Sequence, residues 1–384
     1  MRSLVDLLES AGGRSFLEAR GVVLDGRVFA ERLRPPARAG LIELLGLPPG
    51  SRPVYVAHQT HVDFRRSVVS KLRAARDLRG DSLAPVLLWF DMDRAGSDKA
   101  ATTITWPAAD GEGSIRLVPH RLRNLEPRFL PVARDRLAEV VAQLRAWIDG
   151  TVDDRGRAAR AHERLDRLAG ALPDGDPVTL AECSRALASG LLREQLSFRP
   201  PSAFVSTLAT RGLLSDTLND TLTAIADVVR VFNAAVEGLI AADVDPQVHA
   251  LPDDYLPLNY SCDRCGTRRR LRREQSGADH FAVLDCSCGA GRRFHLGGRE
   301  LSLGELERTG RWSPDVTLPV YLNDLAGGVV VGRSSTLYGL VLDHVLERVL
   351  GRSPIPMLVP EDLAAVLGEE PAVDSVLYDY LVGT

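Results

Sequence analysis

Long apolar runs are missing from this 384-residue sequence. No stretch reaches the roughly 18 apolar residues that a transmembrane helix needs. The first residues, MRSLVDLLESAGG, carry Asp6 and Glu9 inside their apolar stretch. A signal peptide would have an uncharged core, so these residues predict a short amphipathic helix instead. We therefore expect a cytoplasmic protein that has no membrane partner.

Lysine is scarce as well: the chain has only Lys71 and Lys99 beside many arginines, a bias typical of high-GC coding. The net charge of −4 excludes a whole-chain field that would attract nucleic acid or anionic lipid. No Walker loop, G-x-G-x-x-G or G-x-S-x-G motif is present. A hydrophobic content of 45% is typical of a globular protein, and the length suits two or three domains or one domain with an insertion.

Two near-continuous apolar stretches, residues 52–59 and 84–93, predict the first strands of a sheet. Residues 61–78 between them have the spacing of an amphipathic helix. Apolar strands that alternate with helices are typical of a parallel sheet covered on both faces. A third strand is expected at 101–107.

The middle third of the chain is expected to be helical, at 134–149, 178–195 and 214–243. Residues 318–351 return to an α/β texture, with two apolar stretches, a turn that contains glycine, and a helix. A further strand is expected at 353–360. The simplest account is one nucleotide-fold core whose halves are separated by an insertion.

Four of the five cysteines fall in a C-x2-C pair and a C-x-C pair: Cys262, Cys265, Cys286 and Cys288. Four thiolates are the ligand set that zinc takes in a closed, tetrahedral structural site. In the cytoplasm thiols stay reduced, so clustered cysteines favour a metal over disulfides. Two disulfides, or four unrelated thiols, are the alternatives.

Glycines beside each cysteine pair support a zinc ribbon. Gly266 follows Cys265 and can take a positive φ that lets backbone amides approach sulfur, and Gly289 follows the second pair. The segment 267–285 can form a hairpin between the two knuckles. Cys183 stands alone on a helical stretch and is expected to be a buried apolar residue.

Two histidines and eight arginines also lie in this segment. His280 or His295 is an alternative metal ligand, although four thiols already complete the set. The arginines are Arg264, Arg268, Arg269, Arg270, Arg272, Arg273, Arg292 and Arg293. They could bind phosphate or RNA, or they could form the solvated surface of a hairpin. Because aromatic residues for base stacking are few, RNA is a partner that the sequence allows but does not favour.

The turn after the first strand is rich in polar side chains: His58, Gln59, Thr60 and His61. In open α/β sheets, ligands bind beyond the carboxyl ends of strands, and a helix N-terminus there offers amides to a phosphate. The two histidines could stabilise phosphate charge, whereas Asp63 suits an amine or a metal better. The alternative is a pair of surface histidines, with Asp63 in the first turn of the helix.

Acidic residues follow the second strand, at Asp91 and Asp93. Their spacing points both side chains the same way from an extended backbone, where they could hold an amine or Mg²⁺. The alternative is a solvated strand end with Asp98 as a helix cap.

Late in the chain a second phosphate-binding turn is expected at Gly332, Arg333, Ser334, Ser335 and Thr336, before a helix.

Residues 56–78 with 84–93, and residues 317–360, resemble segments of the bacillithiol-biosynthesis cysteine-adding enzymes. That family has a core related to the class I aminoacyl-tRNA synthetases. The resemblance covers roughly a quarter of the chain and implies formation of an amide bond between an amino acid and an amine. By it, His58, Gln59 and Lys71 fall in the first motif, Asp91 and Asp93 in the second, and Gly332 to Ser335 with Tyr338 in the third.

The departures from the family pattern are specific. The usual paired glutamine is His58-Gln59 here, the glycine-rich turn reads Val-Gly-Arg-Ser-Ser, and the long helical C-terminal part is missing. Arg333-Ser334-Ser335 is closer to the signature loop of a class I synthetase, and HQTH is a loose match to the His-x-Gly-His signature. These departures leave the substrate and the need for ATP open.

The expected fold is therefore α/β, with a Rossmann-like parallel-sheet core, a helical insertion and a zinc ribbon. The expected domains are 1–130 for the first half of the core, 131–255 for the helical region, 256–300 for the ribbon and 301–384 for the second half. The expected function is an ATP-dependent amino-acid ligase, with cysteine as one candidate substrate.

In this hypothesis ATP, with or without Mg²⁺, binds between the two turns; His58, His61, Asp91 and Asp93 carry the chemistry. Gln59, Thr60, Lys71 and the residues from Gly332 to Ser335 bind the cofactor. An amino acid and an amine acceptor are the partners, and a homodimer is compatible with the sequence. The alternatives are a non-catalytic zinc-ribbon protein that binds RNA or another protein, and a nucleotidyltransferase of the same superfamily.

Overall fold

A computed structural model describes residues 1–78, 80, 82–96, 98–108, 111–175, 177–368 and 374–383. These residues form two compact units. Unit 1 comprises residues 1–57, 70–88 and 201–368. Unit 2 comprises the described residues of 58–69, 89–200 and 369–384. The division falls at residue 200, inside the region that the sequence predicts to be helical.

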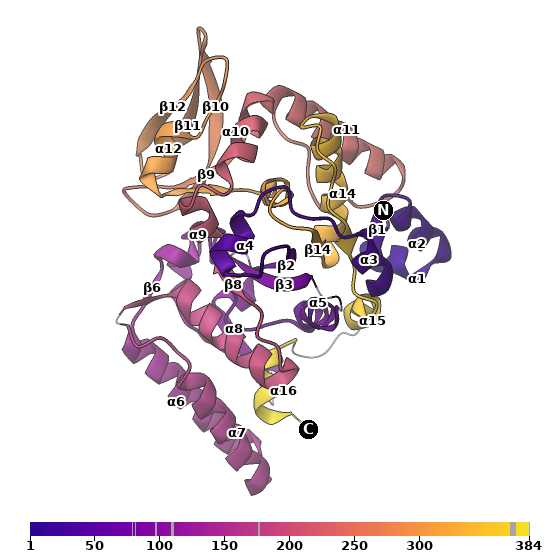
Figure 1. Ribbon diagram of the computed structural model, residues 1–384. Helices are drawn as coiled ribbons and strands as arrows, with labels where there is room; N and C mark the ends of the chain where they lie inside the picture. Colours follow the sequence, from indigo (N-terminus) through magenta and orange to yellow (C-terminus); the bar gives the residue numbers. More distant parts are fainter. Residues whose placement is uncertain are drawn as a thin grey trace. The chain divides into compact units, whose positions relative to one another are not determined.

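Unit 1 contains a six-stranded parallel sheet in the order β1–β15–β14–β2–β3–β8 (Figure 1). The strands are β1 (Val22–Val23), β2 (Arg52–Gln59), β3 (Leu83–Phe90), β8 (Ser202–Phe204), β14 (Gly328–Val330) and β15 (Met357–Leu358). In the inner strands, Val54, Val56, Leu87 and Leu88 are all buried. Strands buried on both faces are typical of a parallel sheet, so the sheet predicted from the sequence is confirmed.

The described helices of unit 1 begin with four short ones, α1 (Leu4–Glu9), α2 (Ala11–Glu18), α3 (Gly26–Arg32) and α4 (Gly40–Leu45). Helix α5 (Arg66–Asp77) belongs to unit 1 from Ser70 onward. The later ones are α9 (Val205–Thr210), α10 (Ser215–Thr223), α11 (Ile225–Ala241), α12 (Gly304–Thr309), α13 (Leu318–Leu322), α14 (Arg333–Arg348) and α15 (Leu363–Gly368). Side chains cap several of them: Asp25, for example, accepts from the amides of Arg27 and Val28 at the start of α3.

A second sheet in unit 1 is antiparallel and carries the cysteines. Its order is β12–β11–β10–β9–β13, with β9 (Tyr255–Ser261), β10 (Arg268–Ser276), β11 (Asp279–Asp285), β12 (Gly291–Gly297) and β13 (Trp312–Pro314). Strands β10 and β11 form the hairpin that the sequence predicts between the cysteine pairs. Strand β13 pairs with β9, so the ribbon sheet extends past the predicted boundary at residue 300.

Unit 2 is mostly helical. It contains α6 (Arg134–Thr151), α7 (Arg155–Ala169), α8 (Leu180–Leu196) and α16 (Val376–Val382), with 3-10 turns at Lys99–Ala101, His120–Leu122 and Pro127–Phe129. Two small antiparallel pairs join them: β4 (Thr103–Ala108) with β5 (Gly111–Arg116), and β6 (Pro131–Val132) with β7 (Val178–Thr179). The Trp147 ring of α6 packs against Trp106 of β4 and Tyr378 of α16.

Three expected elements differ in the structure. The strand expected at 101–107 forms the β4–β5 hairpin instead of joining the main sheet, and Pro107, which cannot donate a ladder bond, suits an edge strand. The apolar stretch 318–322 is helix α13, with a proline in its first turn, where no amide is needed. The helix expected at 214–243 breaks at Ala224, so that α10 and α11 each turn their own apolar face inward.

No described helix combines the length and apolarity that crossing a bilayer requires.

Candidate functional site

The four ribbon cysteines converge at one point. Their sulfur atoms lie within 4.8 Å of one another, and no other group of three or more potential ligand residues does so among the described residues. The Sγ atoms of Cys262 and Cys288 are 3.7 Å apart, and those of Cys265 and Cys286 are 3.5 Å apart. A ligand set with this spacing could hold a metal ion.

Backbone turns place the two cysteine pairs. In the first knuckle, the amide of Gly266 donates to the carbonyl of Cys262 at 2.8 Å, and Gly266 has φ 72°. In the second, the amide of Gly289 donates to the carbonyl of Cys286 at 2.9 Å, and its φ is 82°. Both left-handed conformations favour glycine, so the positive φ predicted for Gly266 is confirmed.

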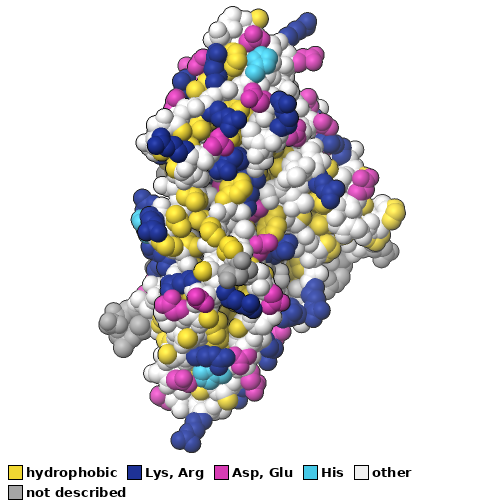
Figure 2. All heavy atoms as spheres, turned by 90° about the vertical axis from the view of Figure 1, so that its left-hand side faces the viewer, with side chains coloured by type: hydrophobic (Ala, Val, Ile, Leu, Met, Phe, Trp, Pro, Cys, Tyr) yellow, Lys and Arg dark blue, Asp and Glu magenta, His cyan; other side chains and the backbone are white. Residues whose placement is uncertain are grey.

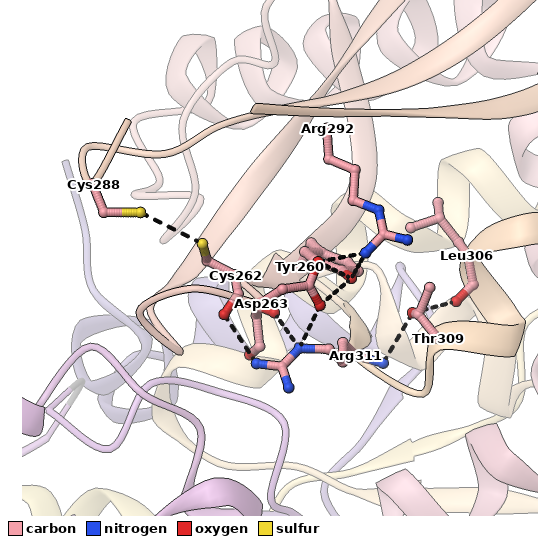
Figure 3. A network of polar contacts seen from close by, with 9 residues as sticks. Tyr260, Cys262, Asp263, Cys288, Arg292, Leu306, Thr309 and Arg311 are labelled. Carbon is pink, nitrogen blue, oxygen red and sulfur yellow. Dashed lines mark hydrogen bonds and ion pairs between the residues drawn. The ribbon is translucent and has the colours of Figure 1, made fainter. Parts of the chain in front are cut away.

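The first knuckle is braced by a polar network that sequence reasoning missed (Figure 3). The Arg311 guanidinium donates to the carbonyl oxygens of Ser261 at 2.7 Å and Cys262 at 2.9 Å. It also pairs with Asp263 at 3.2 Å, and the Tyr260 hydroxyl donates to the same carboxylate at 2.9 Å. Because Arg311 follows the last cysteine by more than twenty residues, no local motif could have identified it.

The ribbon histidines lie outside this cluster. His280 is in β11, and Nε2 of His295 in β12 lies 3.2 Å from Oδ1 of Asp279. The metal-binding group found among the described residues consists of the four cysteines alone.

Cys183 is fully buried in α8, as predicted, and burial raises the pKa of its thiol to about 12.

Most ribbon arginines are engaged inside the ribbon sheet. Three have acidic partners: Arg272 with Asp285, Arg292 with Asp263 and Arg293 with Glu274. Three donate to backbone carbonyls: Arg264, Arg268 and Arg273. Over the upper part of Figure 2, at the height of the ribbon in Figure 1, basic and acidic side chains are interspersed. This pairing favours a solvated hairpin surface over a nucleic-acid interface.

In unit 2 the last residues of β2 and the turn after β3 meet through side chains. The Gln59 amide donates to Oδ2 of Asp93 at 2.5 Å, and Oε1 of Gln59 lies 3.1 Å from Nε2 of His61. The rings of His58 and His61 are 4.6 Å apart in an edge-to-face arrangement. Two hydrogen bonds and one ring contact thus connect four of the predicted polar residues, called the polar chain below.

The backbone around these residues departs from the sequence prediction. Helix α5 begins at Arg66, so the turn HQTH is separated from the helix N-terminus, and the amide of Arg66 is already bonded to Asp374. Asp91 and Asp93 lie in a turn after Phe90. The alternation of an extended strand therefore does not orient them, and the prediction that both point the same way from an extended backbone is wrong.

The surface-turn alternative for the histidine segment is also wrong. His61 and Thr60 are 4% and 1% exposed, so neither is a surface residue. The Thr60 hydroxyl is buried without a hydrogen-bond partner among the described residues. Asp98, in contrast, does cap a short helix: its carboxylate accepts from the amide of Ala100 at 3.0 Å and pairs with Arg65.

Asp63 has a structural partner in place of the amine or metal suggested by the sequence. Its carboxylate accepts from the Ser375 hydroxyl at 2.5 Å and from the Leu377 amide at 2.9 Å. Burial raises its pKa from 3.8 to about 7, although these hydrogen bonds act in the opposite direction. The residue therefore anchors the start of α16 and is not available to a ligand.

The Asp63 carboxyl predicts a pH dependence of stability. Because its folded pKa is raised, its contribution to the free energy of unfolding is fully present below pH 3.8 and is lost as the pH rises through 7. From pH 5 to 8 the wild type should lose roughly 2 kcal/mol more than Asp63→Asn, whose amide keeps both contacts. Urea denaturation at the two pH values measures this, with exposed Asp253→Asn as control. Equal losses in wild type and Asp63→Asn would contradict the assignment.

The late polar turn lies in unit 1, at the carboxyl end of β14. Gly332 is the N-cap of α14, and its amide donates to the Ser335 hydroxyl at 2.8 Å. The Thr336 hydroxyl donates to the Gly332 carbonyl at 2.7 Å. Ser335 and Thr336 therefore serve the helix start, while Arg333 and Ser334 are exposed and can meet a ligand.

Lys71 of α5 lies against this turn. Its side chain is 9% exposed, and burial lowers the pKa of its ammonium group to about 8. A Cβ added at Gly332 would lie 3.0 Å from Cδ and 3.4 Å from Cε of Lys71, so the lysine stem passes directly over the glycine. Within the described part of the chain, the ammonium group has no hydrogen bond or ion pair.

Tyr338, which the resemblance assigned to the third motif, is half-buried in α14, and desolvation raises its pKa to about 12. It lines a small cavity of about 70 Å³ together with Tyr55 and Ser335.

The polar residues predicted from the sequence fall in two groups. Gly332, Arg333, Ser334 and Lys71 are together in unit 1, and His58, Gln59, His61 and Asp93 are together in unit 2.

No protein-family model matches the chain, and no curated protein matches it.

Proposed function

We propose that the protein is an ATP-dependent ligase with a class I synthetase-like core that joins an amino acid to an amine acceptor. The turn at Gly332 binds the nucleotide phosphates. The parallel sheet, with a helix N-terminus at the carboxyl end of β14, supports a nucleotide-binding core.

The observation that carries this proposal is the buried Lys71 side chain, whose stem passes over Gly332 at the N-terminus of α14. A helix N-terminus has a partial positive charge, so a cation there is unfavourable unless an anion is also bound. Burying a charge without a partner costs further free energy. A phosphate at Gly332 would offset both costs, accept hydrogen bonds from the amides of Arg333 and Ser334 in the first turn of α14, and meet the exposed Arg333 side chain.

The chemistry proceeds in two balanced steps. A carboxylate oxygen of the amino acid attacks the α-phosphorus of ATP, the bond to the bridging oxygen breaks, and pyrophosphate leaves with the electron pair. The acceptor amine then attacks the acyl carbon, AMP leaves, and the amine loses a proton. His58 and His61 stabilise the charge that develops on the phosphate, and Asp91 or Asp93 binds the amino group.

We propose zinc as the metal of the cysteine cluster. Tetrahedral coordination with Zn–S bonds of about 2.3 Å separates sulfur atoms by about 3.8 Å. The distances of 3.7 and 3.5 Å are close to that value. Four protein ligands leave no open position, so the ion holds the ribbon together and takes no part in the reaction.

Pyrophosphate exchange into ATP, measured with a panel of amino acids, tests the ligase proposal. We expect exchange with at least one amino acid. The double variant His58→Ala, His61→Ala should lower its rate by about 100-fold because charge stabilisation is lost. The double variant His120→Ala, His249→Ala, outside the polar chain, should retain it.

Two outcomes would reject parts of this proposal. Absence of exchange with every amino acid, with and without amine acceptors, would exclude adenylation. Full activity in the His58→Ala, His61→Ala variant would exclude these residues from the active site while leaving adenylation in place.

A further inference from the structure

A cleft of about 960 Å³ in unit 1 lies away from the α14 N-terminus. It is formed by α11, by the second half of α14, by the end of α3 and by the segments that follow α2 and α3; the four helices are labelled in Figure 1. Its α14 residues begin at Leu340, eight residues after Gly332, or roughly 12 Å along the helix axis. The cleft is therefore separate from the proposed nucleotide site.

Five arginines from different elements line this cleft: Arg20, Arg32, Arg34, Arg230 and Arg348. Arg20 donates to the carbonyl of Phe16 at 3.1 Å, and Arg230 pairs with Asp227 at 2.7 Å. Within the described part of the chain, the guanidinium groups of Arg32, Arg34 and Arg348 have no hydrogen-bond or ion-pair partner. Arginine has donors and no acceptor, so these guanidinium groups cannot satisfy one another.

The face of α14 toward the cleft is polar but does not neutralise the arginines. Asp343, His344, Glu347 and Arg348 lie on it at helical spacing. Burial, then Glu347, raises the pKa of Asp343 to about 8, which favours its uncharged form, whereas the Arg34 guanidinium acts in the opposite direction. Nδ1 of His344 is buried and has no hydrogen-bond partner among the described residues. Glu347 is then the remaining full negative charge that lines the cleft.

Part of the lining is small and apolar. Helix α11 contributes Ala234, Ala235 and Gly238 beside Arg230, and their short side chains leave the space open; Pro354 and Ile355 add further apolar surface. A cleft whose lining combines guanidinium groups with a small apolar surface fits an anion attached to a flat apolar group. A phosphate ester suits the charge better than a carboxylate, because one phosphate group supplies up to two negative charges and accepts bidentate arginine contacts.

We propose that this cleft binds a phosphorylated small molecule whose apolar ring rests on α11 and whose phosphate is held by Arg34 and Arg348. The site goes beyond the ligase activity and does not depend on it. Phenyl phosphate combines a ring with a dianionic phosphate and is the simplest probe. Inorganic phosphate lacks the ring, and benzoate replaces the phosphate by a carboxylate.

The test is isothermal titration calorimetry at low salt, in the Lys71→Met background that disables the proposed nucleotide site. Phenyl phosphate should bind there, more tightly than inorganic phosphate or benzoate. Adding Arg34→Glu and Arg348→Glu should weaken it at least 10-fold. Adding Arg121→Glu and Arg299→Glu, which make the same charge change on exposed arginines outside the cleft, should leave it unchanged. If the first pair does not fold, Arg34→Gln with Arg348→Gln makes the same test without charge reversal.

No saturable binding in the Lys71→Met protein, or equal weakening by both pairs of substitutions, would overturn the cleft site. Benzoate that bound as tightly as phenyl phosphate would overturn the assignment to a phosphate. Failure of the ligase proposal has a different signature: pyrophosphate exchange would be absent while phenyl phosphate still bound the cleft.

Discussion

Replacing Cys262 with serine is expected to abolish zinc binding and to unfold the ribbon. Cys262 is fully buried, and its sulfur is one of the four that converge. The free energy of binding a structural zinc ion is about 10–16 kcal/mol in small zinc modules, and it is also folding free energy. Because β10, β11 and β12 present long, exposed polar faces and little core, the metal must supply much of the stability of this sheet.

The measurements are zinc content by mass spectrometry and hydrogen exchange of residues 255–297. Wild type should contain one zinc per chain, and Cys262→Ser none, with amides of β10 to β12 losing protection. Cys183→Ser is the matched control. It places a hydroxyl in a buried site of unit 2 and costs about 1–3 kcal/mol, but it should keep the zinc. A Cys262→Ser protein with one bound zinc and a protected ribbon would refute the site.

Sequence reasoning succeeded where the determinants are local. The spacing of Cys262, Cys265, Cys286 and Cys288, with Gly266 at a left-handed turn, is contained in fewer than thirty residues, and each knuckle closes with its own backbone hydrogen bonds. Strands β2 and β3 could also be predicted from the sequence, because a strand buried on both faces needs apolar residues throughout its length.

It failed where distant residues decide the outcome. From the sequence Asp63 suits an amine or a metal, or the first turn of a helix, yet Ser375, 312 positions later, donates to its carboxylate. The turn HQTH was placed at a helix N-terminus, yet α5 begins at Arg66, whose amide is bonded to Asp374. Ser335 was predicted to contact phosphate, but its hydroxyl bonds to the Gly332 amide instead. No periodicity or spacing could supply such partners, since each depends on how separate segments pack.

Lys71→Met is expected to stabilise the fold while it destroys nucleotide binding. The lowering of the Lys71 pKa from 10.5 to about 8 by burial corresponds to a cost on the order of 3 kcal/mol to the folded state. Methionine has a similar length and no charge, so at pH 7 the variant should gain roughly 1–3 kcal/mol in free energy of unfolding. Its affinity for ATP should fall by at least 10-fold, because the phosphate loses its buried cation.

The pH dependence separates this explanation from simple repacking. Below pH 8 the lysine is protonated in both the folded and unfolded states, and the full cost is present. As the pH rises from 8 toward 10.5 the folded protein releases the proton first, so the wild type gains stability that Lys71→Met cannot gain. The stability difference in urea denaturation should therefore be largest at pH 7 and clearly smaller at pH 9.5.

Lys99→Met is the natural control because Lys99 is the other lysine of the chain. Its side chain is 51% exposed and pairs with Glu112, so the substitution should change stability by less than about 1 kcal/mol and leave ATP affinity unchanged. Replacing a residue that stabilises the fold should lower the free energy of unfolding. Replacing a residue that serves a ligand should raise the free energy of unfolding and lower the affinity for that ligand. Unchanged ATP affinity in Lys71→Met, or a loss of stability at pH 7, would remove the main support for a phosphate at Gly332.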